Sequence, residues 1–166
     1  GIVEAVSEFA SRAAESLRLQ DGAAGAVNVF FTTSPFRQND RQHSPSVTVP
    51  LVRPTSDSRH LVAAAVAAVH RLFRPGFNYV KAGVMLVDLQ PAGQRQGELD
   101  LFSAVSDAAG ERPERDHSAL MATMDELNRR FGRSTVHIGS ASTAAHDTEE
   151  RSWATRQERR SPRVTT

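Results

Sequence analysis

Histidine and carboxylate side chains are the groups in this chain that could hold a metal ion or move a proton. The 166 residues include six histidines and 19 Asp and Glu residues. No two histidines are four residues apart, so no helix face would pair them as metal ligands. Asp57, Asp88, Asp125 and Glu126 are near the ends of expected elements, but none forms a D-x-D or D-E pair at the end of an apolar strand. Two-metal phosphoryl transfer needs such a pair. We therefore expect no metal, no cofactor and no catalytic residue in this chain.

Other catalytic signatures are also missing from the sequence. The chain has no cysteine, so it has no thiolate nucleophile and no thiolate zinc site. It has no phosphate-binding G-x-x-x-x-G-K loop, no G-x-G-x-x-G after a strand and no G-x-S-x-G elbow around a serine. The nearest literal match to paired carboxylates, Glu98-Leu99-Asp100, lies among leucines in a segment expected to be a linker. The chain by itself is expected to catalyse nothing.

Charge and hydropathy narrow the remaining function classes. Lys and Arg number 20 against 19 acids, a net charge of +1, and Lys81 is the only lysine. The C-terminal residues 151–163 carry five arginines opposed only by Glu158, which makes a local basic patch. No apolar run approaches the ~20 residues of a membrane helix, and residues 1–4 do not resemble a signal peptide. We expect a soluble protein of the cytoplasm with no membrane contact.

Five elements are expected in the first 89 residues. Apolar residues at three- and four-residue spacing predict helices, and alternation with β-branched and aromatic residues predicts strands. The expected order is a helix at 2–19, strands at 26–33 and 47–51, a helix at 61–72 and a strand at 79–89.

Single residues refine these expectations. Asp57 is positioned to cap the second helix. Pro50 cannot donate to a strand ladder, so its strand should lie at an edge or end there. The strand at 79–89 is apolar on both faces, which favours a central position, and Gly83 within it indicates a bulge or the close approach of another backbone.

This α-β-β-α-β order predicts an α+β fold, a ferredoxin-like split β-α-β domain that lacks its first strand. The missing strand would leave an unpaired edge, so the chain is expected to be a fragment or a truncated reading frame. Residues 1–90 form the domain and 91–116 a linker. Residues 117–166 form a mostly helical, basic tail, with a helix at 117–131, Gly132 as its C-cap and a short strand at Thr135–Ile138. The rest of the tail has too few apolar residues to fold alone.

The order of several segments resembles the C-terminal part of the UmuC family, the Y-family translesion DNA polymerases that are catalytic subunits of bacterial DNA polymerase V. The resemblance continues into the tail at Leu120-Met121, Asp125, Asn128 and Trp153. It therefore covers nearly the whole chain, while 141–150 has little resemblance. The matching segments are 8–18 (EFASRAAESLR), 29–36 (VFFTTSPF), 54–59 (PTSDSR), 79–86 (YVKAGVML) and 161–166 (SPRVTT).

The resemblance implies that residues 1–90 are a little finger domain, a module that grips DNA beside a right-handed polymerase. Contacts to backbone phosphates would hold double-stranded primer-template DNA without reading its sequence. Further implied partners are a UmuD-like accessory protein and a recombinase filament, with a nucleoid-associated location. The family's magnesium carboxylates belong to a palm domain that these residues do not include. The expected DNA-binding residues are Thr32, Thr33, Ser34, Arg37, Arg41, Tyr79 and Lys81.

The apolar island in the linker resembles the family's sliding-clamp motif of glutamine, leucine, a small polar residue, leucine and phenylalanine. Leu99, Asp100, Leu101 and Phe102 match its last four positions, and Glu98 replaces the glutamine. Gln96 could supply the amide in a longer register. Such a segment would insert its apolar side chains into a preformed groove of a bacterial sliding clamp. The alternative is that these side chains pack back on the domain.

Taken together, these patterns predict the DNA-binding and clamp-tethering portion of an error-prone translesion polymerase used in the SOS response to DNA damage. Two alternatives remain open. The chain could be a stand-alone interaction module that competes for the clamp or for the polymerase's partners, or it could be a non-functional remnant.

Overall fold

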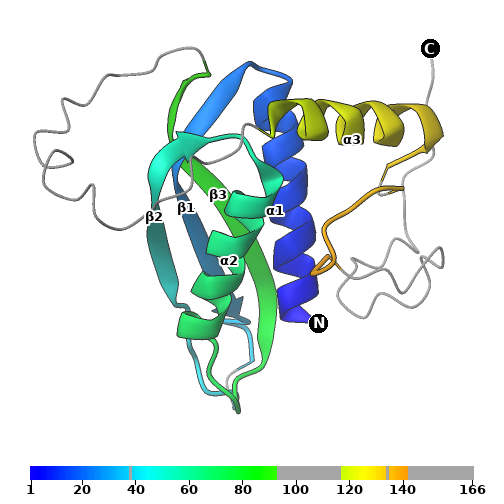
Figure 1. The fold of residues 1–166 in the computed structure, drawn as a ribbon. Helices are drawn as coiled ribbons and strands as arrows, with labels where there is room; N and C mark the ends of the chain where they lie inside the picture. Colours follow the sequence, from blue (N-terminus) through cyan, green and yellow to red (C-terminus); the bar gives the residue numbers. More distant parts are fainter. Residues whose placement is uncertain (38, 93–116, 134, 142–166) are drawn as a thin grey trace, which may run out of the picture.

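The computed structural model describes residues 1–37, 39–92, 117–133 and 135–141, and within them the chain is an α+β protein. Three helices and three strands follow one another along these residues, in nearly the places that the sequence predicts (Figure 1). Their order is α1 (Ile2–Arg18), β1 (Gly22–Thr33), β2 (Ser46–Thr55), α2 (Ser58–Leu72), β3 (Tyr79–Pro91) and α3 (Ser118–Phe131).

The three strands form one antiparallel sheet with the order β2-β1-β3. Pro50 of β2 lies opposite Ala26 of β1. β2 is an edge strand of the sheet, as expected for a strand with a residue that cannot donate to a ladder. The expectation that 79–89 is the central strand is wrong for the described sheet. β1 pairs with a strand on each side, whereas β3 pairs with β1 alone. Burial agrees with this order, since β1 contains fully buried residues whereas β2 and β3 contain none.

The strand order also bears on the ferredoxin-like expectation. In that order the last strand pairs with the first strand of the fold, the strand expected to be missing from this chain. Here β3 pairs directly with β1 from Gly22–Pro91 at one end to Thr33–Tyr79 at the other. The α+β class and a little-finger-like arrangement are compatible with this sheet, but the ferredoxin-like order is not confirmed.

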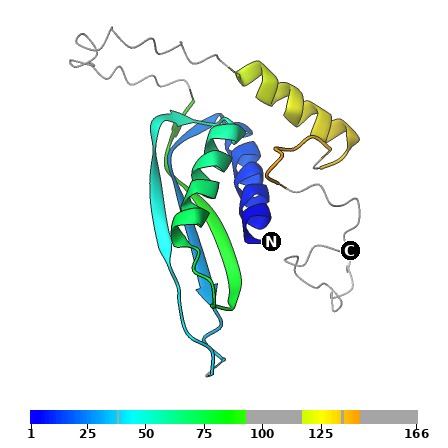
Figure 2. The ribbon, with the colours of Figure 1, turned by 60° about the horizontal axis from the view of Figure 1, so that its bottom comes forward.

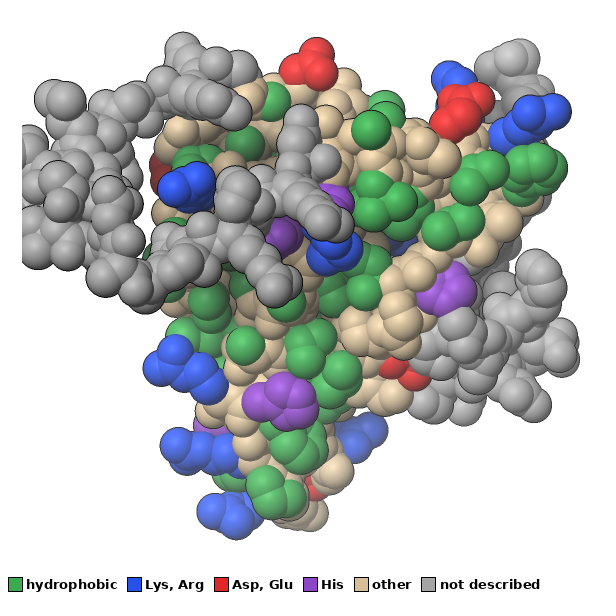
Figure 3. Space-filling model, viewed as in Figure 1, with side chains coloured by type: hydrophobic (Ala, Val, Ile, Leu, Met, Phe, Trp, Pro, Cys, Tyr) green, Lys and Arg blue, Asp and Glu red, His purple; other side chains and the backbone are tan. Residues whose placement is uncertain are grey.

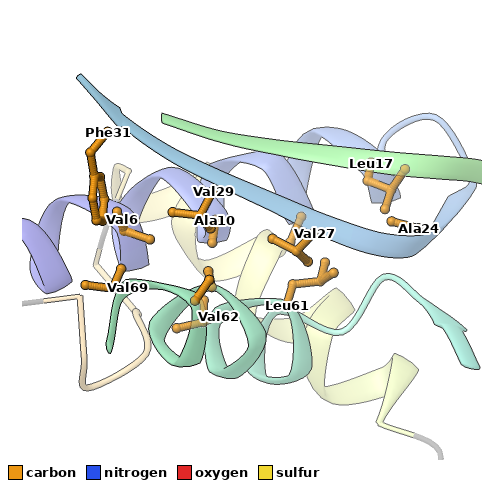
Figure 4. Close-up of a cluster of buried hydrophobic side chains, with 13 residues drawn as sticks. Val6, Ala10, Leu17, Ala24, Val27, Val29, Phe31, Leu61, Val62 and Val69 are labelled. Carbon is orange, nitrogen blue, oxygen red and sulfur yellow. The ribbon is translucent and has the colours of Figure 1, made fainter. Parts of the chain in front are cut away.

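Helices α1 and α2 cover one face of the sheet, and the core lies between the two layers (Figure 2). Fully buried side chains come from both helices and the central strand: Val6 of α1, Val27 and Phe31 of β1, and Leu61 of α2 (Figure 4). Alanines at Ala10, Ala14, Ala65 and Ala68 let the two helices approach each other and the sheet closely. Burial of a large apolar side chain contributes roughly 1.5–3 kcal/mol, so these few residues supply much of the driving force.

The close approach at Gly83 involves a side chain and not another backbone. Gly83 of β3 lies opposite Phe30 of β1. A Cβ atom added to Gly83 would lie 2.3 Å from the Cζ atom of the Phe30 ring. The ring therefore occupies the space that any side chain at position 83 would need.

The caps predicted from the sequence are confirmed. Asp57 is the N-cap of α2, and its Oδ1 atom accepts a hydrogen bond of 2.8 Å from the Arg59 amide. Gly132 ends α3 with a φ of +109°, a conformation that glycine adopts without strain.

The segment after α3 does not form the short strand expected at Thr135–Ile138. The side chain of Asn128 explains this, because it satisfies both backbone groups of Val136. Its Nδ2 donates to the Val136 carbonyl at 2.9 Å, and its Oδ1 accepts from the Val136 amide at 2.8 Å. The segment thus returns along α3 without needing a partner strand.

An ion pair attaches α3 to the first two helices. The Arg18 side chain donates to both carboxylate oxygens of Asp125, at 2.7 and 2.6 Å. Its third nitrogen donates to the Ser56 carbonyl at 2.7 Å and to the Ser58 hydroxyl at 2.9 Å. One guanidinium therefore joins the end of α1, the start of α2 and the middle of α3.

No helix among the described residues is long and apolar enough to span a lipid bilayer. The sequence-based expectations for 93–116 and 142–166 lie outside the described residues. They include the clamp motif with Gln96 and residues 98–102, and the basic patch after residue 150.

Candidate nucleic-acid interface

The residues expected to bind DNA lie at one end of the sheet, where β1 ends and β3 begins. Thr32 is the cross-strand neighbour of Lys81, and Thr33 that of Tyr79. Ser34, Arg37 and Arg41 follow in the loop between β1 and β2. We call the loops 34–45 and 73–78, which adjoin at this end, the tip (Figure 1).

The two loops of the tip are joined by hydrogen bonds and ring contacts. Asn78 Nδ2 donates to Asp40 Oδ2 at 3.1 Å, from one loop to the other. The His43 ring packs against Phe77, with centroids 4.6 Å apart, and its Nδ1 atom lies 2.7 Å from the Tyr79 hydroxyl. The guanidinium of Arg41 lies over the same Phe77 ring, 5.0 Å from its centroid.

Gln42 organises the longer loop from within. Its Nε2 atom donates to the carbonyls of Ser34, Arg37 and Asp40 at 3.0, 3.3 and 3.1 Å. Its Oε1 atom accepts from the Thr33 hydroxyl at 2.8 Å. One amide side chain thus binds backbone carbonyls that strand pairing does not reach and links the loop to Thr33 at the end of β1.

Two of the residues expected to bind DNA, Thr33 and Tyr79, have partners within the chain. The Thr33 side chain is only 3% exposed, and its hydroxyl also accepts from the His43 amide at 3.1 Å. Tyr79 packs against Phe31 and Phe73 and bonds to His43. Both strand residues therefore bind loop residues and support the tip.

The other expected residues are exposed or partly exposed. Arg37 and Arg41 lie on the loop surface, and Arg37 makes one long contact with Asp40 at 3.6 Å. Thr32 and Lys81 lie side by side on the face of the sheet opposite the core, since alternate residues of β1 fill the core. Ser34 contributes its carbonyl to the loop and is half-buried.

The charge at the tip is one-sided. The described residues of loops 34–45 and 73–78 include the arginines Arg37, Arg41 and Arg74, but only one acid, Asp40. Figure 3 shows Lys and Arg side chains gathered at the lower end of the molecule, where Figure 1 places these loops. Such a concentration of arginine attracts polyanions.

Next to Thr32 and Lys81, the sheet face opposite the core is uncharged at Phe30, at Asn28 and at the residues paired with them. Asn28 Nδ2 donates to the hydroxyls of Ser46 and Thr48, at 3.1 and 2.9 Å across the β1–β2 ladder. On the other side, Asn28 pairs with Met85, and Phe30 lies opposite Gly83. None of these paired positions holds an acid that would repel a phosphate backbone.

Sequence reasoning missed the residues that build the tip, namely Gln42, His43, Phe77 and Arg74. In the sequence His43 is one of six isolated histidines, and nothing in a single sequence pairs it with a tyrosine 36 residues away. The spacing of Phe77 and Tyr79 at i and i+2 was the available signal, because it sets both rings on one side of an extended segment.

A second concave region lies between α3 and the segment that follows it. The hollow has a volume of about 240 Å³ and a mainly apolar lining that includes Leu120, Met124, Leu127 and Val136. His137 and Arg59 also line it. Among the described residues, no group of three His, Cys, Asp or Glu side chains could hold a metal ion at this or any other position.

Comparisons with known proteins agree with this organisation. Residues 1–99 match the model of the impB/mucB/samB family C-terminal domain, and residues 118–166 match a domain of unknown function, DUF4113. The chain is 36% identical over 163 residues to the protein UmuC of Salmonella typhimurium and, over the same length, to the protein MucB of Escherichia coli. It is 38% identical over 141 residues to the protein ImpB of Salmonella typhimurium.

These alignments cover 98% of the chain for UmuC and MucB and 85% for ImpB. They cover only 35%, 35% and 31% of the relatives themselves, so the chain spans about a third of the length of these curated relatives. The family model accounts for the whole α1–β3 unit that carries the tip. The chain therefore belongs to the impB/mucB/samB family and corresponds to the C-terminal part of its members.

Proposed function

We propose that this chain is the DNA-binding and clamp-tethering portion of an error-prone translesion DNA polymerase of the UmuC type. Residues 1–90 hold the primer-template duplex, residues 91–116 carry the clamp motif, and 117–166 form the tail. The reaction itself belongs to the family's palm carboxylates with magnesium, which are not among these 166 residues. By resemblance to the family, its further partners are a UmuD-like accessory protein and a recombinase filament.

The observation that carries the proposal is the cationic tip beside an uncharged stretch of the sheet face. Arg37, Arg41 and Lys81 can neutralise phosphates, while Thr32 can donate a hydrogen bond to one. Contacts to phosphates position a protein on DNA but carry no direct sequence information. A polymerase that copies damaged templates of any sequence requires that kind of grip.

The clamp tether is supported by the sequence Glu98-Leu99-Asp100-Leu101-Phe102. A short apolar anchor that follows β3 in the chain would let the domain stay near DNA that a clamp encircles. Binding at two sites raises the effective concentration at each, without any new contact at the polymerase site.

The test of the DNA grip is a titration of the chain with a blunt duplex at several salt concentrations. A variant with Arg37→Gln, Arg41→Gln and Lys81→Gln removes three of the cations at this end. The plot of log affinity against log salt concentration should become flatter by about 0.9 for each phosphate that the variant no longer neutralises. Affinity should hardly change between duplexes of different sequence.

The matched control removes the same charge elsewhere. Arg129 and Arg130 in the last turn of α3 and Arg133 just after it are exposed. A variant with all three changed to Gln has the same net charge as the tip variant. An equal decrease of affinity in both variants would show that net charge alone attracts the duplex. A salt-independent affinity for the native chain would refute the phosphate grip altogether.

A further inference from the structure

Phe36 is the most exposed aromatic side chain among the described residues. It is 91% exposed, against 63% for Phe131 and 48% for Phe73. Isolated apolar residues are common on protein surfaces, so exposure alone does not indicate a role. The ring stands out because of the turn that carries it and because the loops of the tip carry three arginines.

Hydrogen bonds close the turn that carries Phe36. Pro35 presets the backbone of the turn, and the Arg37 amide closes it by donating to the Ser34 carbonyl at 3.3 Å. The same Ser34 carbonyl accepts from Gln42, which bonds to the Arg37 carbonyl as well. The backbone on both sides of Phe36 is thus anchored, and the ring projects from a preorganised support.

The surroundings of the ring favour an anionic partner. Arg37 is the next residue, and its side chain is 60% exposed despite a long contact with Asp40 at 3.6 Å. Arg41 and Arg74 belong to the same tip, so its arginines outnumber its one acid by three to one. An apolar protein surface would have to desolvate these guanidinium groups, whereas a nucleic acid would pair them with phosphates. Aromatic rings interleaved with arginine are the pattern by which proteins bind single strands, with bases stacked on the rings.

The ring can reach only a base whose face is open. In a duplex both faces of each base are covered by neighbours, and inserting a side chain costs a few kcal/mol of stacking. An unpaired base offers a free face at no such cost. We propose that Phe36 stacks on an unpaired base of single-stranded DNA, while the arginines of the tip contact the flanking phosphates.

This inference rests on the proposed DNA-binding function and adds a second kind of substrate, the single-stranded part of a primer-template. The duplex contacts Lys81 and Thr32, on the sheet face next to the tip. Phe36 then stacks on a base beyond the duplex end. The tip would thereby distinguish a junction from an uninterrupted duplex.

The test compares the full chain with its Phe36→Leu variant. Leucine keeps an apolar side chain but removes the flat ring. Binding is measured to a fluorescently labelled oligothymidine and to a blunt duplex at one low salt concentration. Base stacking on an aromatic side chain is worth about 1–3 kcal/mol, so affinity for the single strand should fall roughly 5- to 150-fold. Affinity for the blunt duplex should stay unchanged within about twofold.

Two further variants sharpen the comparison. Phe36→Trp retains a flat ring and should preserve single-strand binding. Phe131→Leu removes an exposed ring from α3 and should change neither affinity. Because Phe36 buries little surface, the thermal unfolding midpoint of Phe36→Leu should match that of the native chain, and a matching midpoint excludes misfolding as the cause of any decrease in binding.

The outcomes separate this inference from the proposed function. If the native chain binds the duplex and Phe36→Leu binds the single strand as tightly as the native chain does, the stacking interaction is refuted. The proposed duplex binding is then unaffected. Equal decreases for single strand and duplex also overturn it, since the ring would then serve both. Weaker binding to purified sliding clamp, with single-strand binding intact, makes the ring a protein contact instead. A native chain that binds neither nucleic acid overturns both proposals.

Discussion

Asp57 shows how one side chain ties local structure to pH. Burial alone would raise the pKa of its carboxyl group, but hydrogen bonds from the Arg59 side chain and amide and the charges of Arg59 and His60 outweigh burial and hold that pKa below its ordinary value. The shortest of these contacts joins Arg59 Nη2 to Asp57 Oδ2 at 2.6 Å. The ionised cap therefore stabilises the folded chain.

The sign of the pH dependence follows from the direction of this shift. Because the pKa is lower in the folded state, the stabilisation is fully present above the ordinary carboxyl pKa and is lost as the pH falls through the folded value. Asp57→Ala should lower the free energy of unfolding by about 1 kcal/mol at pH 7. The difference from the native chain should shrink in acid.

Urea unfolding at pH 7 and at successively lower pH values measures this effect. Asp57→Asn is the control, because it keeps an oxygen that can cap the helix but cannot ionise. Asp57→Asn should lower the free energy of unfolding by less than Asp57→Ala does, because only the charge is missing. In acid, the native chain and Asp57→Asn should be equally stable. A deficit of Asp57→Ala that is the same at every pH would contradict an ionised cap.

At the scale of paired strands, Phe30 and Gly83 form a unit. The ring of Phe30 lies where a side chain at position 83 would be. Gly83→Ala should therefore destabilise the chain by about 1 kcal/mol, even though alanine is ordinarily better than glycine inside a strand by roughly 0.5–1 kcal/mol.

A Phe30→Ala substitution should reverse the sign of the effect of Gly83→Ala on stability. In a Phe30→Ala background the ring is absent, so Gly83→Ala should become neutral or stabilising. Thermal unfolding of both single variants and the double variant gives this coupling energy. Independent effects of the two substitutions would show that the ring moves aside at no cost.

The docking of α3 depends on the Arg18–Asp125 pair. Their side chains are 13% and 24% exposed, so removing one partner leaves the other charge poorly solvated. Asp125→Asn should weaken the attachment of α3 by on the order of 2 kcal/mol. Hydrogen exchange should then quicken in α3 while the amides of β1 stay protected.

Glu126 is the neighbouring control for this prediction. It is 55% exposed and pairs with Arg129 on the helix surface, so Glu126→Gln should leave exchange in α3 nearly unchanged. Equal exchange in native and Asp125→Asn chains would mean that apolar contacts hold the helix. Faster exchange throughout the sheet would mean that α3 is part of the cooperative core.

At the scale of the whole molecule, the two proposed tethers should reinforce each other. Affinity for a clamp loaded on DNA should exceed affinity for the duplex or the clamp alone by about 10²–10⁴. The variant with Leu99, Leu101 and Phe102 all changed to Ala should return to the affinity for duplex alone. Fluorescence anisotropy with free and clamp-loaded duplex measures the difference. Equal affinity of the native chain and this variant for the loaded clamp would refute the tether.

The sequence by itself determined the element order and the caps. Asp57, Gly132 and Pro50 behave as expected because caps, turns and ladder donors depend on the residue and its immediate neighbours. The exposed arginines of the tip were also predictable, since a polar stretch between two strands must be a loop at the surface.

Only the tertiary structure decided which strand is central, what lies over Gly83 and how the tip is closed. The apolar character of 79–91 does not distinguish a central strand from an edge strand covered by a helix, because both bury one face. The His43–Tyr79 and Arg18–Asp125 contacts join residues 36 and 107 positions apart. Such pairs depend on how the strands align and the helices pack, and no local pattern encodes that alignment.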